Sequence, residues 1–161
     1  MRPLSMLYTI APTPLGDALL VADADGALTR LAFDTTPPHG ARYAPSRLGE
    51  AVGQLTAYFA GERTAFDLVL RPEGTLFQRE VWDALLEIPH GETRTYGDLA
   101  HRLGQPGGAQ AVGAANGANP LAVVIPCHRV IGADGSLTGY AGGLHRKRAL
   151  LDLESRQTRL F

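Results

Sequence analysis

The 161-residue chain has a single cysteine, Cys127, and this scarcity excludes two structural devices. One cysteine cannot form an intramolecular disulfide, and it cannot build a cysteine-rich zinc site. A chain without disulfides fits a reducing compartment, so we expect a cytoplasmic protein. Histidine and carboxylate side chains occur without a recognisable metal-binding motif, so we expect neither a metal nor any other cofactor.

Long apolar runs are also missing. No stretch approaches the ~20 apolar residues that a membrane-spanning helix needs. Residues 1–16 lack a sustained apolar core followed by a small-residue cleavage site, so we expect no secretory signal and no membrane partner. The length allows one domain of ordinary size or two small ones, and an apolar content of 45% is typical of a globular protein.

The net charge of −1 hides an uneven distribution. Residues 1–93 carry 7 basic against 12 acidic side chains, whereas residues 94–161 carry 8 against 4. A basic C-terminal part favours contact with a polyanion there. An ordinary fluctuation in composition explains the same pattern, so charge alone leaves the question open.

The first part of the chain is predicted to form a sheet with one helix. Three short runs rich in apolar and β-branched residues, separated by turn sequences, predict a β-meander over residues 6–11, 18–24 and 28–33. Ser46 is expected to cap a helix that runs to Ala60 and ends at Gly61. The apolar face of this helix is expected to hold Leu48, Val52, Leu55 and Phe59. Residues 66–70 predict one more strand, and residues 71–74 a linker.

The second part is predicted to be helical, with Trp82 in its core. The expected helices cover residues 77–88, 96–103, 109–117 and 144–153. Thr95 is expected to cap the second of them, and a tight turn at 105–108 leads to the third. Two short helices joined by such a turn indicate a helix-turn-helix unit, although many helical hairpins share this pattern.

Cys127 follows a short apolar run and Pro126, and His128 and Arg129 come directly after it. A thiol beside an imidazole and a guanidinium lies in surroundings that favour the thiolate, which is the nucleophilic form. A lone cysteine is more often a small buried apolar side chain. Because Pro126 fixes the entry to the turn and two potential cations follow, we interpret Cys127 as a nucleophile.

Residues 119–154, NPLAVVIPCHRVIGADGSLTGYAGGLHRKRALLDLE, closely resemble the active-site region of the O6-alkylguanine-DNA alkyltransferases, the methylated-DNA–protein-cysteine methyltransferases. The resemblance rests on PCHR at 126–129, the preceding Asn119-Pro120 and GYAGG at 139–143, and it extends over residues 75–155. It implies a mixed α/β (α+β) fold. A ribonuclease-H-like sheet domain with a helix (1–72) would precede a helical domain (73–161) that contains the helix-turn-helix.

The resemblance implies DNA repair by direct reversal, with single-turnover transfer of an alkyl group such as methyl from O6-alkylguanine to Cys127. His128 is expected to be the base, acting through a bridging water because adjacent side chains point in different directions. Glu154, at the end of the last helix, would orient His128 and support its positive charge. Asn119 is expected to brace the turn, and Tyr96 to donate a proton or hydrogen bond to the everted guanine.

By the same resemblance, Tyr140 walls the base pocket, Lys147 supports it from the last helix and Arg129 is structural. The small-residue helix is expected to enter the minor groove of DNA, although tight helix packing explains the small residues equally well. The remaining contacts to DNA or substrate are expected from Arg94, Thr95, Gln110, Ala111, Asn116 and Val130.

Gln110 departs from the family pattern, which usually has an arginine here to enter the space left by the everted base. Glutamine is shorter and uncharged, so the efficiency of base flipping is in question. The expected partner is double-stranded DNA that contains O6-alkylguanine, with O4-alkylthymine as a second candidate lesion. We expect a monomer, and clustering along DNA stays open.

Two other functions are weighed against this one. Alkyltransferase-like proteins bind lesions without enzymatic activity; they share the fold and motif but lack the cysteine, and Gln110 leaves room for this alternative. A cysteine hydrolase built from Cys127, His128 and Glu154 is the third possibility. The adjacent Cys-His pair and the lack of a recognisable oxyanion loop disfavour it.

Overall fold

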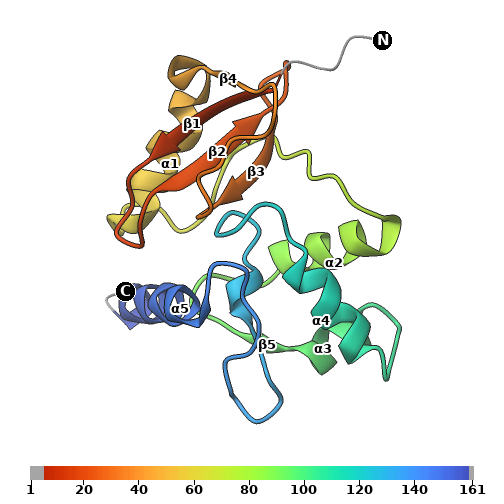
Figure 1. Ribbon diagram of the computed structural model, residues 1–161. Coiled ribbons are helices and arrows are strands. Elements are labelled where there is room, and N and C mark those ends of the chain that lie inside the picture. The colour runs from red at the N-terminus through yellow and green to blue at the C-terminus, as the bar shows by residue number, and fades with distance from the viewer. Residues whose placement is uncertain (1–5, 160–161) are drawn as a thin grey trace. The chain divides into compact units, whose positions relative to one another are not determined.

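The computed structural model of the protein describes residues 6–159, which form two compact units that divide between Glu73 and Gly74 (Figure 1). The first unit combines a β-sheet with a helix, and the second is mainly helical. The expected mixed α/β fold class is therefore confirmed. Among the described residues, no helix is both long and apolar enough to cross a membrane.

The sheet of the first unit has the strand order β3-β2-β1-β4. β1 (Leu7–Ala11), β2 (Ala18–Ala22) and β3 (Leu28–Ala32) pair antiparallel and form the expected meander. β2 lies between two partners and is buried along its whole length. β4 (Arg42–Tyr43) pairs parallel to β1 in a stretch for which no strand was predicted.

The helix of the first unit does not begin as predicted. Ser46 lies inside a short 3-10 helix, η1 (Pro45–Leu48), and α1 (Gly49–Phe59) follows without a side-chain cap. Pro45 fixes its own φ for a first helical position, so the turn starts one residue before the expected cap. The predicted apolar face was right at Leu48 and Leu55, which are buried, and wrong at Val52 and Phe59, which are half-buried. The buried residues of α1 are Ala51, Gln54, Leu55 and Tyr58.

The predicted strand at 66–70 was also wrong. This segment makes one isolated bridge, between Leu70 and Leu28, and no ladder. The side chain of Gln54 holds it instead, donating to the carbonyl of Asp67 at 3.0 Å and accepting from its amide at 2.8 Å. A buried glutamine therefore binds the backbone at Asp67, while Leu28 of β3 binds the backbone only at the end of the segment, through Val69 and Arg71.

The second unit begins with α2 (Leu76–Leu86), which starts at a capping box between Thr75 and Gln78 that the sequence analysis missed. Trp82 is 2% exposed, which confirms its expected place in the core. Its indole nitrogen donates to the carbonyl of Ala115 at 2.9 Å. The buried ring therefore fastens α2 to α4 while its polar atom stays satisfied.

Two short helices joined by a tight turn follow. α3 (Tyr96–Arg102) starts at Thr95, whose hydroxyl accepts from the amide of Asp98 as expected for a cap. α4 (Ala109–Gly117) packs against α3, and Gly113 brings its backbone close to the ring of Tyr96.

The remaining elements frame Cys127. A short 3-10 helix, η2 (Cys127–Arg129), runs into β6 (Val130–Ile131), which pairs parallel with β5 (Arg94–Thr95). α5 (Leu144–Arg159) packs against η2 and continues past the predicted end at residue 153. Glu154 is therefore inside the last helix rather than at its end.

Gly74 provides a test of the second unit's packing. A Cβ at this position would lie 2.4 Å from Cη2 of Trp82, which the core holds in place. We expect Gly74→Ala to lower the free energy of unfolding by about 1–3 kcal/mol, the usual range for an overpacked site. Urea unfolding of the full chain measures the change.

Gly97→Ala, in α3 of the same unit, is the matched control. The nearest atom to its Cβ would be 3.7 Å away, an ordinary contact, so better helix propensity should raise the free energy of unfolding by about 0.5 kcal/mol. Equal effects of the two substitutions would contradict the packing at Gly74.

Candidate active site

Two asparagines hold the turn that carries Cys127. The amide of Asn119 donates to the carbonyl of Ile125 at 2.8 Å, and its oxygen accepts from the amide of Leu121 at 3.0 Å. Asn116, on α4, donates to the carbonyl of Cys127 at 3.4 Å. Between Asn119 and Cys127, Val123 has a φ of 71°, a conformation that β-branched residues avoid. The turn is thus held in an unfavourable backbone shape by its surroundings.

Cys127 itself is 5% exposed. Burial raises its pKa from the usual 9.0 to about 11, against the opposing effects of the Asn119 amide and the charge of Lys147. The expectation that His128 and Arg129 would favour the thiolate was therefore wrong. Both side chains bind another group, so their nearness in sequence does not help the sulfur, and the resting form is the thiol.

That other group is Glu154, which is 1% exposed. Nε2 of His128 lies 2.8 Å from its Oε2. Arg129 donates to both carboxylate oxygens, from Nε at 2.8 Å and from Nη2 at 2.9 Å, and its Nη1 donates to the carbonyl of Ile88 at 2.7 Å. A bidentate guanidinium and an imidazole thus satisfy one buried carboxylate.

The charges of this cluster follow from its contacts. Burial would raise the pKa of Glu154, but the hydrogen bonds from His128 and Arg129 outweigh it and hold that pKa well below its usual value. Burial disfavours a charged imidazole and lowers the pKa of His128 despite its bond to Glu154, and the positive charges of Arg129 and Lys147 act in the same direction. A neutral His128 that donates from Nε2 to Glu154 keeps Nδ1 as an acceptor. Nδ1 is buried and has no hydrogen-bond partner among the described residues, so His128 can act as a base.

A small cavity adjoins the sulfur. Its volume is about 10 Å³, which is close to the space that one water molecule needs. The lining residues are Asn116, Gly117, Asn119, Ala122, Cys127, Gly139, Tyr140 and Ala141. The hydroxyl of Tyr140 is buried without a hydrogen-bond partner among the described residues, and burial raises the pKa of this phenol. A purine does not fit here unless the segment around Tyr140 moves.

Hydrogen bonds to Thr138 hold the segment around Tyr140 in place. The phenol of Tyr96 donates to the carbonyl of Thr138 at 3.2 Å and accepts from its hydroxyl at 3.1 Å. Nζ of Lys147 donates to the same carbonyl at 2.8 Å and lies 6.0 Å from the centroid of the Tyr96 ring. Burial lowers the pKa of Lys147. Helices α3 and α5 thus share one attachment point on the loop.

The other residues expected to contact DNA or substrate lie apart from this cluster. Gln110 and Ala111 are exposed on α4, and Arg94 pairs with Glu92 at 3.1 Å. Thr95 uses its hydroxyl as the cap of α3. Val130 is fully buried in β6 and does not line the cavity, so it cannot contact a base in this conformation.

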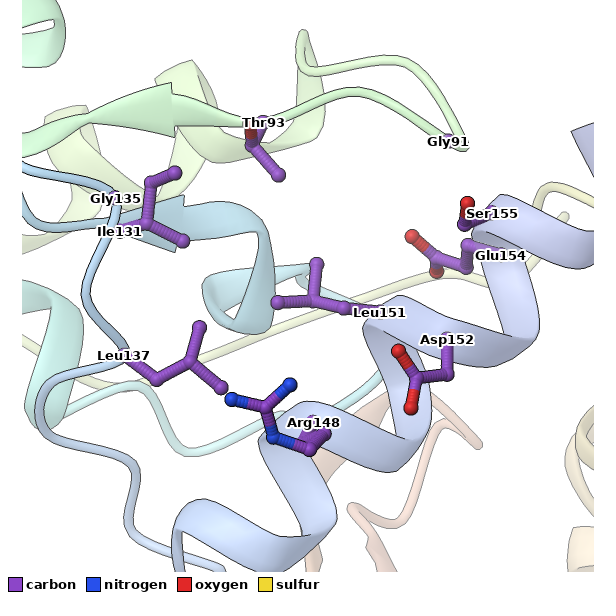
Figure 2. Close-up of a pocket in the computed structure, with 10 residues that line it drawn as sticks. All are labelled: Gly91, Thr93, Ile131, Gly135, Leu137, Arg148, Leu151, Asp152, Glu154 and Ser155. Atoms are coloured by element: carbon purple, nitrogen blue, oxygen red, sulfur yellow. The ribbon is translucent and has the colours of Figure 1, made fainter.

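A second pocket, of about 320 Å³, is lined by Glu154 but not by Cys127 (Figure 2). Leu151 projects into it from α5, and Arg148 and Asp152 supply charged groups from the same helix. Gly91 closes the end near Glu154. Sequence analysis did not suggest this pocket, because its residues come from three separate segments with no shared motif.

Comparison with known proteins fits this geometry. Residues 76–156 match the DNA-binding domain of 6-O-methylguanine DNA methyltransferase, and residues 6–72 match its ribonuclease-like domain. The chain belongs to the 6-O-methylguanine DNA methyltransferase family. This confirms the resemblance inferred from the PCHR motif and the ribonuclease-like fold expected for the first unit.

Relatives in the 6-O-methylguanine DNA methyltransferase family match nearly the whole chain. The methylated-DNA–protein-cysteine methyltransferase of Mycobacterium tuberculosis is 52% identical over 151 residues, covering 91% of each chain. That of Methanosarcina acetivorans is 50% identical over 154 residues, covering 92% of this chain and 98% of its own. The crystal structure of the Mycobacterium tuberculosis OGT in complex with DNA superposes with a TM-score of 0.89 at 51% identity, covering 94% of both chains.

The burial of Cys127 predicts slow reaction with general thiol reagents. A pKa of about 11 instead of 9.0 lowers the thiolate fraction near neutral pH about a hundredfold. We expect iodoacetamide to alkylate the folded protein at least about a hundredfold more slowly than the urea-unfolded protein. Mass spectrometry of the Cys127 peptide over time measures both rates, and equal rates would contradict the buried thiol.

Proposed function

We propose that this protein repairs DNA by direct reversal, moving an alkyl group from O6 of guanine to Sγ of Cys127. The observation that carries the proposal is the charge-neutral base beside the cysteine: His128 bonds to Glu154 at 2.8 Å and keeps a buried, unbonded Nδ1. Displacing an alkyl carbon from oxygen calls for a soft nucleophile, and a thiolate is the best available side chain.

The reaction balances with groups that the site contains. The thiol proton passes to Nδ1 of His128 through a bridging water. The sulfur electron pair forms the S–C bond as the C–O6 bond breaks, and that bonding pair leaves with guanine. Guanine takes up one proton from water at a ring nitrogen, and His128 later releases the thiol proton to water, so the protons balance. Glu154 stabilises the imidazolium meanwhile.

The product is a thioether on Cys127, which is chemically stable, and no described residue offers a route back to the thiol. Each molecule therefore acts once. A cysteine held beside a base favours this reaction over mere lesion binding, since alkyltransferase-like binders lack the cysteine.

Base entry needs the loop around Tyr140 to move. Tyr96 then exchanges its hydrogen bond to Thr138 for one to the everted base, and Lys147 keeps hold of the loop. The two asparagines, Asn116 and Asn119, keep Cys127 in place during this movement. Asn116 is thus a brace for the turn rather than a residue that contacts DNA, because it is 2% exposed.

The proposed DNA-binding face is the exposed side of α4, where small side chains allow close approach. Its exposed residues are Gln110, Ala111, Ala114 and Gly117. Electrostatic attraction is modest. Divided at Glu73, the two units carry 6 basic against 8 acidic side chains and 9 against 8, a smaller contrast than the sequence division suggested. We therefore propose recognition of double-stranded DNA mainly by shape, with O6-alkylguanine as the lesion.

Cys127→Ser tests the assignment of the nucleophile. A hydroxyl is a far weaker nucleophile at neutral pH, so transfer should be lost while DNA binding stays nearly unchanged. The wild-type protein should gain one methyl group per molecule, on Cys127, after incubation with duplex DNA containing O6-methylguanine. Mass spectrometry measures the gain, and a gel shift measures binding. A methyl group on the Cys127→Ser protein would place the nucleophile elsewhere.

Gln110→Arg tests the role of α4 in base eversion. Arginine reaches further and can donate a charge-assisted hydrogen bond into the space that the base leaves, a gain of about 1 kcal/mol, or several-fold in single-turnover rate. The gain should appear on duplex DNA and nearly vanish with free O6-alkylguanine, which needs no eversion. Gln105→Arg, the same change at an exposed position in the turn before α4, controls for added charge alone. A similar gain from both variants on duplex DNA would contradict a specific role for residue 110.

A further inference from the structure

The side-chain amide of Asn116, beside Cys127, has one end without a hydrogen-bond partner. Asn116 is 2% exposed, and its Nδ2 donates to the carbonyl of Cys127 at 3.4 Å. Because a carbonyl can only accept, this bond fixes which end of the amide is the oxygen. That oxygen, Oδ1, is buried and has no hydrogen-bond partner among the described residues. A buried acceptor of this kind is unfavourable until some group donates to it.

Asn116 belongs to the wall of the cavity that adjoins the sulfur. Cys127 and Tyr140 line the same space, whose volume of about 10 Å³ suits one small polar group. The amide of Asn119 also lines it, but both of its ends already bind backbone groups of the turn. The other lining residues have no polar side chain, and they are Gly117, Ala122, Gly139 and Ala141.

Tyr140 offers a second unpaired group, but its position changes during base entry. Its hydroxyl is buried and has no hydrogen-bond partner in the part of the chain that the structure describes. The segment around Tyr140 has to move before a purine fits, whereas Asn116 lies on α4 and is bonded to Cys127 itself. The side-chain acceptor that stays beside the sulfur during the reaction is therefore Oδ1 of Asn116.

We propose that Asn116 is a specificity residue that favours O6-alkylguanines whose alkyl group carries a hydroxyl on its second carbon, as in O6-(2-hydroxyethyl)guanine. The inference rests on the proposed function and names a substrate class for it. The hydroxyl of the lesion donates to Oδ1 of Asn116, while the bond from Nδ2 to the carbonyl of Cys127 stays in place. The amide thus braces the turn with one end and binds the alkyl group with the other.

The geometry of the displacement directs the second carbon toward this wall. The sulfur, the first carbon and O6 lie on one line, with the reacting atoms about 3–3.5 Å apart before the reaction. The rest of the alkyl group points sideways from that line, into the space beside the sulfur that Asn116 lines. The S–C bond forms at the first carbon as the C–O6 bond breaks, and that bonding pair leaves with guanine. The hydroxyl is unchanged, and the product is a hydroxyethyl thioether on Cys127.

Selectivity follows from what each alkyl group does to the amide oxygen. A propyl group has as many non-hydrogen atoms as a hydroxyethyl group, but it cannot donate a hydrogen bond. Propyl in the cavity therefore leaves Oδ1 of Asn116 unpaired and keeps water away from it, whereas hydroxyethyl supplies the bond. A site with a buried polar group rejects analogues that lack the matching hydroxyl in this way. The net gain from one neutral hydrogen bond corresponds to roughly threefold to tenfold in rate.

The test compares single-turnover transfer from two duplex DNAs, one with O6-(2-hydroxyethyl)guanine and one with O6-propylguanine. DNA is kept saturating, and mass spectrometry of the Cys127 peptide measures each rate. Asn116→Leu and Asn116→Met replace the amide with apolar side chains. Gln105→Leu, which removes an exposed amide from the turn before α4, is the matched control. The ratio of the two rates is compared between proteins, because a loosened turn at Cys127 would slow both reactions and leave their ratio unchanged.

We expect the wild-type and Gln105→Leu proteins to transfer hydroxyethyl roughly threefold to tenfold faster than propyl. Both Asn116 variants should lose this preference, whatever their absolute rates. The same ratio in the wild type and in the Asn116 variants would overturn the inference. A wild-type protein that transfers propyl as fast as hydroxyethyl would overturn it too, and this comparison needs neither variant to fold. Failure of the wild type to gain any alkyl group, methyl from O6-methylguanine included, would instead overturn the proposed function.

Discussion

The second unit depends on one buried carboxylate. Removing an ionised glutamate from water costs several kcal/mol, so Glu154 stays charged in the interior only because its oxygens are fully hydrogen-bonded. Arg129 supplies two of those bonds and also binds the carbonyl of Ile88. Helix α5, η2 and the segment after α2 are thereby fixed to one another. The position of His128, and with it the base of the candidate site, follows from this arrangement.

The same carboxylate explains why the thiol of Cys127 stays protonated in the absence of substrate. His128 and Arg129 follow Cys127 directly in the chain, yet both face Glu154. Cys127 is left among apolar and amide groups, and burial raises the pKa of its thiol. Deprotonation therefore has to accompany the reaction rather than precede it. The orientation of His128, with Nδ1 unbonded, suits that task.

The features that the sequence predicted correctly are those encoded by residues close together in the chain. The meander strands are bounded by turn residues, Thr95 caps its helix through a neighbour three residues away, and the motif at Cys127 is contiguous. Contacts between distant segments were missed, because no local pattern signals them: β4 pairs with β1 over two residues only, and the side chain of Gln54 binds the backbone of Asp67. The error about the thiolate has the same origin, since adjacency along the chain was taken for adjacency in space.

The closed cavity beside Cys127 has a further consequence for a protein whose proposed reaction consumes it. Such a protein is a reagent, and its capacity equals the number of unreacted molecules. The bonds of Tyr96 and Lys147 to Thr138 keep the loop shut over a space of about 10 Å³, so stray electrophiles in solution have little access to the sulfur. The closed loop therefore preserves the unreacted thiol of Cys127 until a base large enough to displace the loop binds.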